Sequence, residues 1–285
     1  MKADFFTFGA VLLWATLASL ATLLSDIPPF LLTGIGLLIG AAVSLPALRS
    51  GIKPWKVPAR SLLIGVYGLF GYHFMLFLAL QTAPAVEANL VNYLWPLLIV
   101  LLSPLFTKSL SLNFRYVLAA LSGFAGAVIA ITYNSSALGS SSIEVGYLFA
   151  LAAAVIWATY SLATTKVPRF PTPAIGLFAL VSGLLAIGAH FVFEPATSIS
   201  ASDWILLVML GAGPLGGAFY LWDAALKIGD PRRIGLLAFL TPLLSTVLLV
   251  LVSGHSLSWQ LLVATALIVG GALLGPRTPS EAKAK

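Results

Sequence analysis

Long apolar stretches separated by short polar connections constrain this chain more than any other feature of its sequence. Of its 285 residues, 60% are hydrophobic and 8% are charged, and the mean hydropathy is +1.04. A water-soluble domain carries about a quarter charged residues. A bilayer-spanning helix needs about 20 apolar residues, so the chain can supply about ten spans joined by short loops. The composition therefore excludes an ordinary water-soluble globule.

Ten apolar stretches predict ten transmembrane helices, because a backbone in lipid must satisfy its own hydrogen bonds. The first five lie at residues 5–24, 30–48, 61–82, 85–106 and 114–133. The second five lie at residues 145–165, 174–193, 204–226, 234–252 and 259–274. The first stretch is too long for the core of a typical secretory signal. The predicted fold class is an all-α polytopic membrane protein.

A Ser-rich segment at residues 134–143 has no apolar periodicity and is typical of a linker between two halves. We therefore expect one five-helix unit over residues 1–133, a second over residues 144–276, and a tail at residues 277–285. Residues 49–60 are predicted to form a basic, Pro-containing surface loop. The chain has no Cys, so disulfides and thiolate metal sites are excluded, and we predict neither a metal nor a cofactor.

The basic residues fix an orientation in the membrane. If the N terminus is cytoplasmic, all 15 fall in cytoplasmic loops or termini: Lys2, Arg49, Lys53, Lys56, Arg60, Lys108, Arg115, Lys166, Arg169, Lys227, Arg232, Arg233, Arg277, Lys283 and Lys285. The outer loops instead hold Asp26, Glu87, Glu144, Glu194 and Asp203. This segregation follows the positive-inside rule and predicts ten spans with both termini cytoplasmic. Because the basic residues are dispersed between apolar runs, we predict no nucleic-acid partner.

The two halves repeat each other. A shift of 146 residues pairs Gly65 with Gly211, Gly71 with Gly217, and Pro96 with Pro242 without a gap. A shift of 143 residues places Trp14-Ala15-Thr16 on Trp157-Ala158-Thr159. Five helices per copy is an odd number, so the second copy enters the membrane from the opposite side and the repeats are inverted. Inverted repeats are a recurring plan of secondary transporters, which bind substrate near the midplane between the halves.

These features resemble the drug/metabolite transporter superfamily in its EamA-like branch, over nearly the whole chain. The features that carry this resemblance are the two five-helix repeats, the short loops, the paired Trp-Ala-Thr in the predicted helices 5–24 and 145–165, and the paired prolines in the predicted helices 85–106 and 234–252. The chain is most similar to the YddG-type aromatic amino acid exporters of bacterial inner membranes. That resemblance implies export of aromatic amino acids through a central cavity, and leaves other neutral amino acids as substrates open. No short motif marks the substrate.

The predicted helix at residues 85–106 carries the first candidate binding face. Asn89, Asn92, Tyr93 and Pro96 recur at spacings of 3, 4 and 7 residues and therefore share one side of a helix. Polar groups inside spans are costly in lipid and often functional, so we predict that the three polar residues bind substrate. The alternative is that they hydrogen-bond neighbouring helices together. Pro96 and its counterpart Pro242 are predicted conformational hinges.

The other candidates lie in the predicted helices at residues 5–24, 61–82, 145–165 and 204–226. Tyr72 and His73 lie in midspan, and a membrane His either contacts substrate, carries a proton or makes a structural hydrogen bond. Trp14 and Trp157 lie well inside their helices, away from the interfacial belts where most membrane Trp residues are found. The remaining candidates for substrate contact are Tyr160, Ser161 and Tyr220.

The spans contain polar groups without Lys or Arg, which favours a neutral or zwitterionic substrate over a phosphate. An intramembrane enzyme would need a nucleophile with a base or a metal cluster, which one His does not supply. The alternatives that stay open are a carrier of another small metabolite or drug of the same superfamily, a small-molecule-gated channel, and a sensor. Asp223 lies four residues before Lys227, and we predict a salt bridge between them. The spacings Gly36-xxx-Gly40 and Gly271-xxx-Gly275 allow close helix contact, within a monomer or between two copies in a homodimer.

Overall fold

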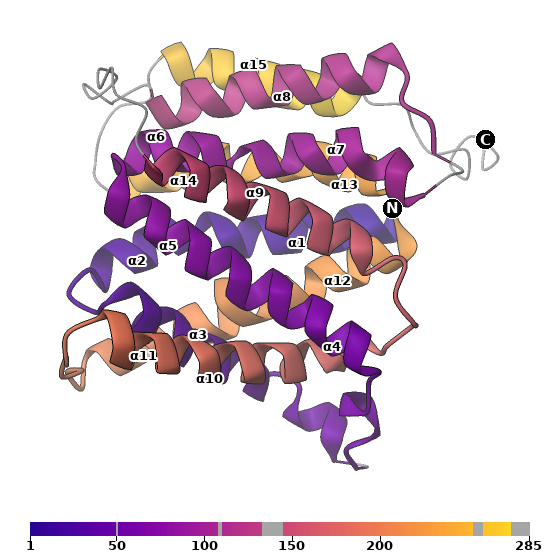
Figure 1. The fold of residues 1–285 in the computed structure, drawn as a ribbon. Coiled ribbons are helices and arrows are strands. Elements are labelled where there is room, and N and C mark those ends of the chain that lie inside the picture. The colour runs from indigo at the N-terminus through magenta and orange to yellow at the C-terminus, as the bar shows by residue number, and fades with distance from the viewer. Residues whose placement is uncertain (50, 108–109, 133–144, 253–258, 275–285) are drawn as a thin grey trace.

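The computed structural model describes residues 1–49, 51–107, 110–132, 145–252 and 259–274, which are helical and contain no strand. The helices run side by side in stacked layers (Figure 1). Seven helical stretches are long and apolar enough to cross a membrane: Lys2–Leu23, Ala59–Thr82, Glu87–Phe106, Phe114–Thr132, Val145–Ala163, Thr172–Phe193 and Asp203–Ile228. Pro29–Ala42 and Trp259–Leu274 are shorter apolar helices. The chain is thus an all-helical, multi-pass membrane protein.

The helices follow the predicted apolar stretches. The first half contains α1 (Lys2–Ala15), α2 (Leu17–Leu23), α3 (Pro29–Ala42), α4 (Ala59–Val66), α5 (Tyr72–Thr82), α6 (Ala85–Asn92), α7 (Leu94–Phe106) and α8 (Phe114–Thr132). The second contains α9 (Val145–Ala163), α10 (Ile175–Phe193), α11 (Asp203–Ala212), α12 (Ala218–Ile228), α13 (Pro231–Ala238), α14 (Leu240–Val252) and α15 (Trp259–Leu274). The expected linker at 134–143 and tail at 277–285 lie outside the described residues, as do Lys108, Glu144 and Gly275.

Several predicted helices are interrupted. A π-helical turn at Tyr67–Gly71 joins α4 to α5, and another at Gly213–Gly217 joins α11 to α12. Helix α6 ends before Tyr93 and α13 ends before Phe239, in each case three residues before a proline. Proline lacks the N–H that would bond four residues back, which explains both breaks. The stretch 30–48 is α-helical only to Ala42 and ends in a 3-10 segment.

The interruptions repeat with the sequence. The π-helical turn of the first half begins and ends 146 residues before that of the second half. Helices α5, α6 and α7 likewise begin and end 146 residues before α12, α13 and α14. The shift that pairs glycines and prolines in the sequence therefore pairs the helices and their breaks as well.

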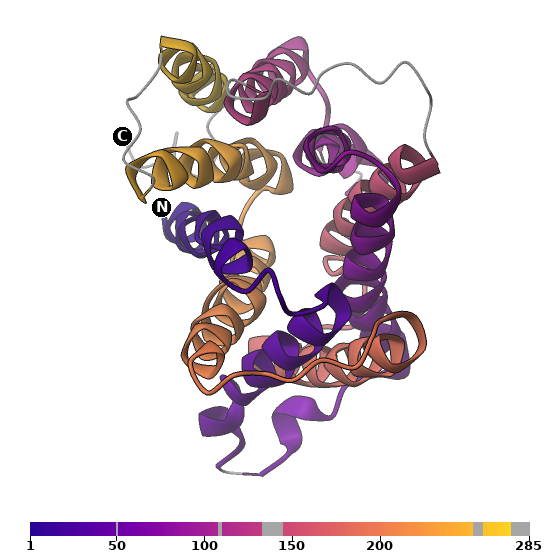
Figure 2. The ribbon, with the colours of Figure 1, turned by 90° about the vertical axis from the view of Figure 1, so that its left-hand side faces the viewer.

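Helices pack across the two halves. Helix α3 packs on α10 and α8 packs on α15, while α5 packs on α9 and α1 packs on α12. In Figure 2, α8 and α15 form an edge layer and the remaining helices surround the centre. Gly40 allows a close approach of two backbones, since a Cβ there would lie 2.7 Å from the Leu215 carbonyl oxygen and 2.9 Å from the Gly216 Cα. The Gly36 and Gly40 pair is therefore used for packing within the chain.

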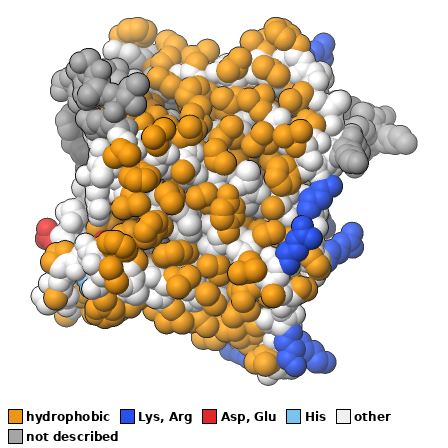
Figure 3. Space-filling view, in the orientation of Figure 1, with side chains coloured by type: hydrophobic (Ala, Val, Ile, Leu, Met, Phe, Trp, Pro, Cys, Tyr) orange, Lys and Arg blue, Asp and Glu red, His pale blue; other side chains and the backbone are white. Residues whose placement is uncertain are grey.

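The two ends of the helices differ in charge. The Lys and Arg side chains visible in Figure 3 gather along its right-hand edge, where α4 begins and α12 ends. The predicted basic loop lies at this end, with Arg49 and Lys53 exposed. We call this the basic end; it includes the N terminus and Lys227. The opposite end, which carries Glu87 and Glu194, we call the acidic end.

Candidate substrate-binding cavity

A cavity of about 430 Å³ lies between the two halves. Its walls come mainly from α1, α2, α3, α5, α6 and α14, with single residues from α8, α11 and the turn at Gly213–Gly217. It adjoins a smaller recess of about 120 Å³ that shares eight of its lining residues. We call these spaces the central cavity and the inner recess. Small-molecule sites occupy about 300–1,000 Å³, so the central cavity is large enough for a metabolite. Within the described residues, no Lys, Arg, Asp or Glu lines either space.

Trp14 organises an aromatic cluster on the basic-end side of the cavity. Its ring centroid lies 5.2 Å from that of Trp222, 5.7 Å from that of Trp157 and 6.1 Å from that of Trp95. The rings meet edge-to-face or tilted, as their quadrupoles favour. The Trp14 indole N–H donates to the Pro214 carbonyl, 3.2 Å away, so it is bound to the π-helical turn of the second half.

Polar side chains of the first half complete the wall. The Asn92 Nδ2 donates to the Tyr72 hydroxyl at 3.2 Å, and the Tyr72 ring packs 5.1 Å from Trp157. The His73 Nδ1 lies 2.6 Å from the carbonyl of Leu69. A carbonyl only accepts, so this nitrogen carries the proton, and a neutral His73 keeps Nε2 as an acceptor.

The structure brings most of the predicted residues together. Trp14, Tyr72, His73, Asn89 and Tyr93 line both spaces. Asn92 and Trp157 line the inner recess, whereas Pro242 lines the central cavity.

Four predicted residues line neither space. Tyr160 is buried against Trp157, and the Ser161 hydroxyl accepts the Trp222 indole N–H at 3.0 Å. The Tyr220 hydroxyl donates to the Gly40 carbonyl at 3.0 Å, and Pro96 is buried in α7. These groups are engaged with protein atoms, so direct contact with substrate is not what they provide in this conformation.

The sequence analysis missed three aromatic or polar residues of the inner recess, namely Trp95, Phe219 and Thr241, and three leucines, namely Leu17, Leu76 and Leu215. Trp95 lies in midspan and could have been found by the argument that selected Trp14. Thr241 is the counterpart of Trp95 at the shift of 146 residues, but a lone Thr in a span gives no such signal.

The central cavity reaches the surface at the acidic end. Among its lining residues, Leu80 is exposed near the end of α5 and Ala85 is exposed at the start of α6. These helix ends lie beside the connection that joins α5 to α6 at the acidic end (Figure 1). Access to the cavity is therefore from this side.

The basic end is closed by aromatic packing and ion pairs. Trp222 is only 1% exposed and packs against Trp14 on the basic-end side. The next residue, Asp223, is 2% exposed. The Asp223 carboxylate accepts from the Lys227 ammonium at 2.5 Å, which confirms the predicted salt bridge. The ammonium lies 4.2 Å above the Phe170 ring centroid and also donates to Thr172.

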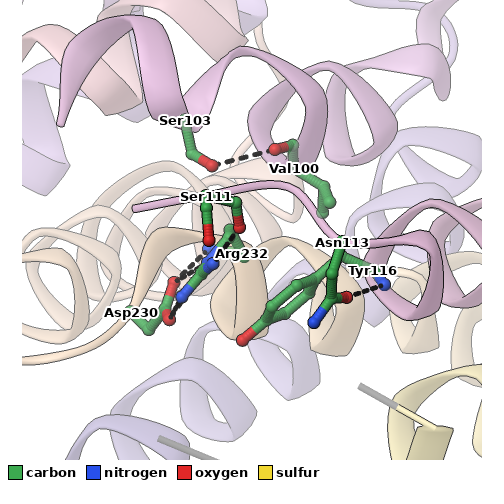
Figure 4. Close-up of polar contacts among 7 residues, drawn as sticks. All are labelled: Val100, Ser103, Ser111, Asn113, Tyr116, Asp230 and Arg232. Atoms are coloured by element: carbon green, nitrogen blue, oxygen red, sulfur yellow. Dashed lines mark hydrogen bonds and ion pairs between the residues drawn. The ribbon is translucent and has the colours of Figure 1, made fainter. Parts of the chain in front are cut away.

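Two further ion pairs lie at the basic end. Arg232 contacts Asp230 at 2.6 Å, donates to the Ser111 carbonyl at 2.6 Å and lies 4.1 Å above the Tyr116 ring (Figure 4). This cluster connects the start of α13 to the start of α8. Arg233 contacts Asp4 at 2.6 Å and so connects α13 to α1. The closed end is thus bridged by charges, whereas the open cavity is uncharged.

The arrangement is suited to binding rather than to bond cleavage. The described residues contain no group of three His, Asp or Glu that could hold a metal. His73 is the only candidate base that lines the cavity within this part of the chain, and no nucleophile is paired with it. What the cavity offers is ring faces, amide and hydroxyl groups, and apolar walls.

Comparison with known proteins agrees with this geometry. The EamA-like transporter family matches the chain twice, over residues 1–132 and 144–275. The aromatic amino acid exporter YddG of Ancylobacter novellus is 44% identical over 95% of this chain and 96% of its own length. The protein of the same name from Escherichia coli K12 is 27% identical over 96% of each chain. A solved crystal structure aligns with a TM-score of 0.89 at 42% identity, over 96% of this chain and 97% of the other. The chain is a membrane transporter and belongs to the EamA-like transporter family.

Proposed function

We propose that this protein exports aromatic and other neutral amino acids by alternating access through the central cavity. The observation that carries the proposal is an uncharged, aromatic-lined cavity between the two halves, with access from one end only. Amino acid zwitterions need hydrogen bonds but no fixed countercharge, and aromatic side chains stack well on Trp and Tyr rings. Relatives that cover almost the whole chain carry the name of aromatic amino acid exporter.

The proposed topology is ten spans in two inverted five-helix repeats. It is supported by the shift of 146 residues shared by sequence and helix boundaries, and by the two matches to one family. The reciprocal packing of α1 on α12 and of α9 on α5 is what a two-fold relation between the repeats requires. The basic end would be cytoplasmic by the positive-inside rule, with both termini there and the protein in the inner membrane.

In this scheme the structure represents a state that is open at the acidic end, outside the cell. Export then requires the aromatic cluster and the ion pairs at the basic end to separate, while the acidic end closes over the substrate. The helix breaks at Tyr93 and Phe239, beside Pro96 and Pro242, are the proposed hinges because the backbone there lacks the regular hydrogen bonds. His73 contributes its Nε2 to the cavity as a substrate contact or proton acceptor.

The test is counterflow in proteoliposomes. Vesicles loaded with unlabelled Phe should accumulate labelled Phe, Tyr and Trp, with saturation and mutual competition. Thr and Met, run beside these three, test the breadth for neutral amino acids. A channel gives no counterflow, and an enzyme gives a chemically altered product. The same assay with and without a pH gradient tests His73: if the gradient changes nothing, proton carriage by His73 is excluded. If none of the five amino acids exchanges, the proposed function is wrong.

A further inference from the structure

Two buried oxygen atoms in the inner recess lack a hydrogen-bond partner. Asn92 is 3% exposed and Thr241 is 5% exposed, and both line the recess. The Asn92 Oδ1 and the Thr241 Oγ1 have no partner among the described residues, while the Asn92 Nδ2 is used by Tyr72. Buried polar atoms in folded proteins are nearly always hydrogen-bonded, so an orphaned pair in one recess indicates a ligand there. The Asn92 Oδ1 can only accept, and the Thr241 hydroxyl can accept as well as donate, so a ligand that donates satisfies both.

The walls of the recess favour a cation. They include the rings of Trp14, Trp95, Trp157, Tyr72 and Phe219. The faces of aromatic rings carry negative charge density and attract ammonium groups, most strongly where water is excluded. A carboxylate would meet the same faces without a Lys or Arg to balance it, since none lines the recess within the described residues. Rings and orphaned acceptors therefore agree on the sign of the ligand charge.

The size of the recess decides which part of a substrate it holds. The recess measures about 120 Å³, against about 430 Å³ for the central cavity. Liquid water occupies about 30 Å³ per molecule, so the recess holds roughly four groups of the size of a water molecule. An ammonium with its α-carbon fits the recess, whereas an aromatic side chain requires the central cavity. The central cavity supplies apolar walls for it, including Leu32, Leu76 and Phe77.

We propose that the inner recess is the subsite for the primary ammonium group of the substrate, with Asn92 and Thr241 as its acceptors. The proposal rests on amino acid transport and deepens it, because it assigns the orientation of the substrate and the group that is recognised. A primary amine donates to both oxygens and faces the rings. An N-acylated amino acid is excluded, since it is neutral at nitrogen and too large for the recess.

The position of the two acceptors also links binding to movement. Asn92 is the last residue of α6, and Thr241 is the second residue of α14. Each therefore lies directly beside one of the two helix breaks, one in each half of the molecule. A bend at either break changes the separation of the two oxygens, so the affinity for the ammonium differs between conformations. That difference is what a carrier needs in order to release its substrate.

The experiment compares three ligands that share a phenyl ring: phenylalanine, phenethylamine, which lacks the carboxylate, and 3-phenylpropionate, which lacks the ammonium. Binding to the purified protein is measured by quenching of Trp fluorescence. We expect phenethylamine to bind and 3-phenylpropionate to bind at least tenfold more weakly. Asn92→Leu and Thr241→Val should each weaken phenylalanine and phenethylamine by roughly tenfold to hundredfold, the value of a hydrogen bond to a charged group. Binding of 3-phenylpropionate should be unchanged.

Ser182→Ala is the matched control, because its hydroxyl is also buried and without a described partner but lies outside both spaces. It should leave all three affinities unchanged. If Asn92→Leu does not fold, Asn92→Asp replaces it and should strengthen phenethylamine relative to 3-phenylpropionate. Equal binding of the amine and the acid, or equal loss of both in the variants, overturns the subsite. Amine binding without counterflow of any amino acid would instead contradict the proposed function and leave the subsite in place.

Discussion

Two adjacent positions, equivalent in α5 and α12, have opposite roles in the two halves. Leu76 and Phe77 of α5 line the central cavity at the acidic end. Their counterparts 146 residues later, Trp222 and Asp223 of α12, are 1% and 2% exposed and close the basic end. One helix position thus faces a cavity in the first half and forms a seal in the second. The comparison shows how a duplicated scaffold can hold two ends in different states at once.

The chemistry of the seal differs from that of the cavity wall in kind as well as in position. The seal combines ring packing around Trp14 with two ion pairs: Asp223 with Lys227 within α12, and Asp4 with Arg233 between the two halves. Among the described residues, the wall of the central cavity contains no charged side chain, and an aliphatic Leu76 stands where the seal has Trp222. Closing one end and opening the other therefore exchanges contacts of different strength, and the following substitutions test that difference from the largest expected effect to the smallest.

Trp222→Ala should have the largest effect, because it removes a buried ring that packs on Trp14 and Trp95 and donates to Ser161. We expect a loss of about 4 kcal/mol of stability, in the range of large-to-small core substitutions. Thermal unfolding in detergent measures it. Leu76→Ala, at the equivalent position of the cavity wall, should cost much less. Equal losses for the two variants would contradict the distinction between seal and wall.

Arg232→Gln should rank second. It leaves the Asp230 carboxylate, 4% exposed, without its ionic partner and removes the bond to Ser111 at the start of α8. Breaking a buried ion pair on one side costs about 3 kcal/mol. Arg115→Gln, an exposed basic residue at the same end, is the control and should be neutral. A neutral result for Arg232→Gln would show that this cluster does not hold the basic end.

Glu194→Gln tests how much the polar contacts between α3 and α10 stabilise the acidic end. The Glu194 carboxylate accepts from the backbone N–H groups of Phe30 and Leu31 at 2.6 and 3.1 Å and pairs with His190 at 2.9 Å. It therefore caps α3 from the end of α10, and its replacement should cost about 1 kcal/mol. Asp26→Asn, exposed at the same end, should not change the unfolding temperature. A loss as large as that of Trp222→Ala would reverse the ranking of the two ends.

Asp4→Asn should have the smallest effect on stability, because the pair with Arg233 is about a quarter exposed. Such pairs contribute up to about 1 kcal/mol, which corresponds to at most roughly a fivefold shift between conformations. The shift should favour opening at the basic end and appear as faster exchange of amide hydrogens in α1. In a double-mutant cycle with Arg233→Gln, the second substitution should add little. Full additivity would show that the pair does not act as a bridge.

The helices and many residues that line the cavity could be predicted from the sequence, but the aromatic seal at the basic end could not. Apolar length predicts the helical stretches. A location well inside the predicted spans selects Trp14 and Trp157 as substrate contacts, and the structure places their ring centroids 5.7 Å apart. Trp222 lies four residues from the end of the predicted span at residues 204–226, so the sequence suggests an interfacial residue, whereas the fold brings it against Trp14. The reverse holds for Tyr160, which is predicted to contact substrate but whose ring lies over Gly68, 92 residues away along the chain.

The helix breaks show the same limit. Pro96 and Pro242 mark two of them in the sequence, since proline removes a backbone donor. The break between α1 and α2 at Thr16 has no such residue, and the Thr16 hydroxyl donates to the Leu13 carbonyl. Of the π-helical turns, Gly213–Gly217 contains Pro214 but Tyr67–Gly71 contains no proline, and the hydrogen bond from Trp14 to the Pro214 carbonyl joins residues 200 positions apart.

Cysteine accessibility tests the central claim most directly, because the natural chain contains no cysteine. Ser245→Cys places a thiol in the central cavity, and Ser161→Cys places one in the closed end, where the native side chain is fully buried. An impermeant thiol reagent is applied to either side of oriented proteoliposomes. The account predicts that Cys at 245 reacts only from the acidic-end side, and that saturating amino acid on the basic-end side slows it while exposing Cys at 161 to that side. Simultaneous reaction of both thiols from one side would contradict alternating access.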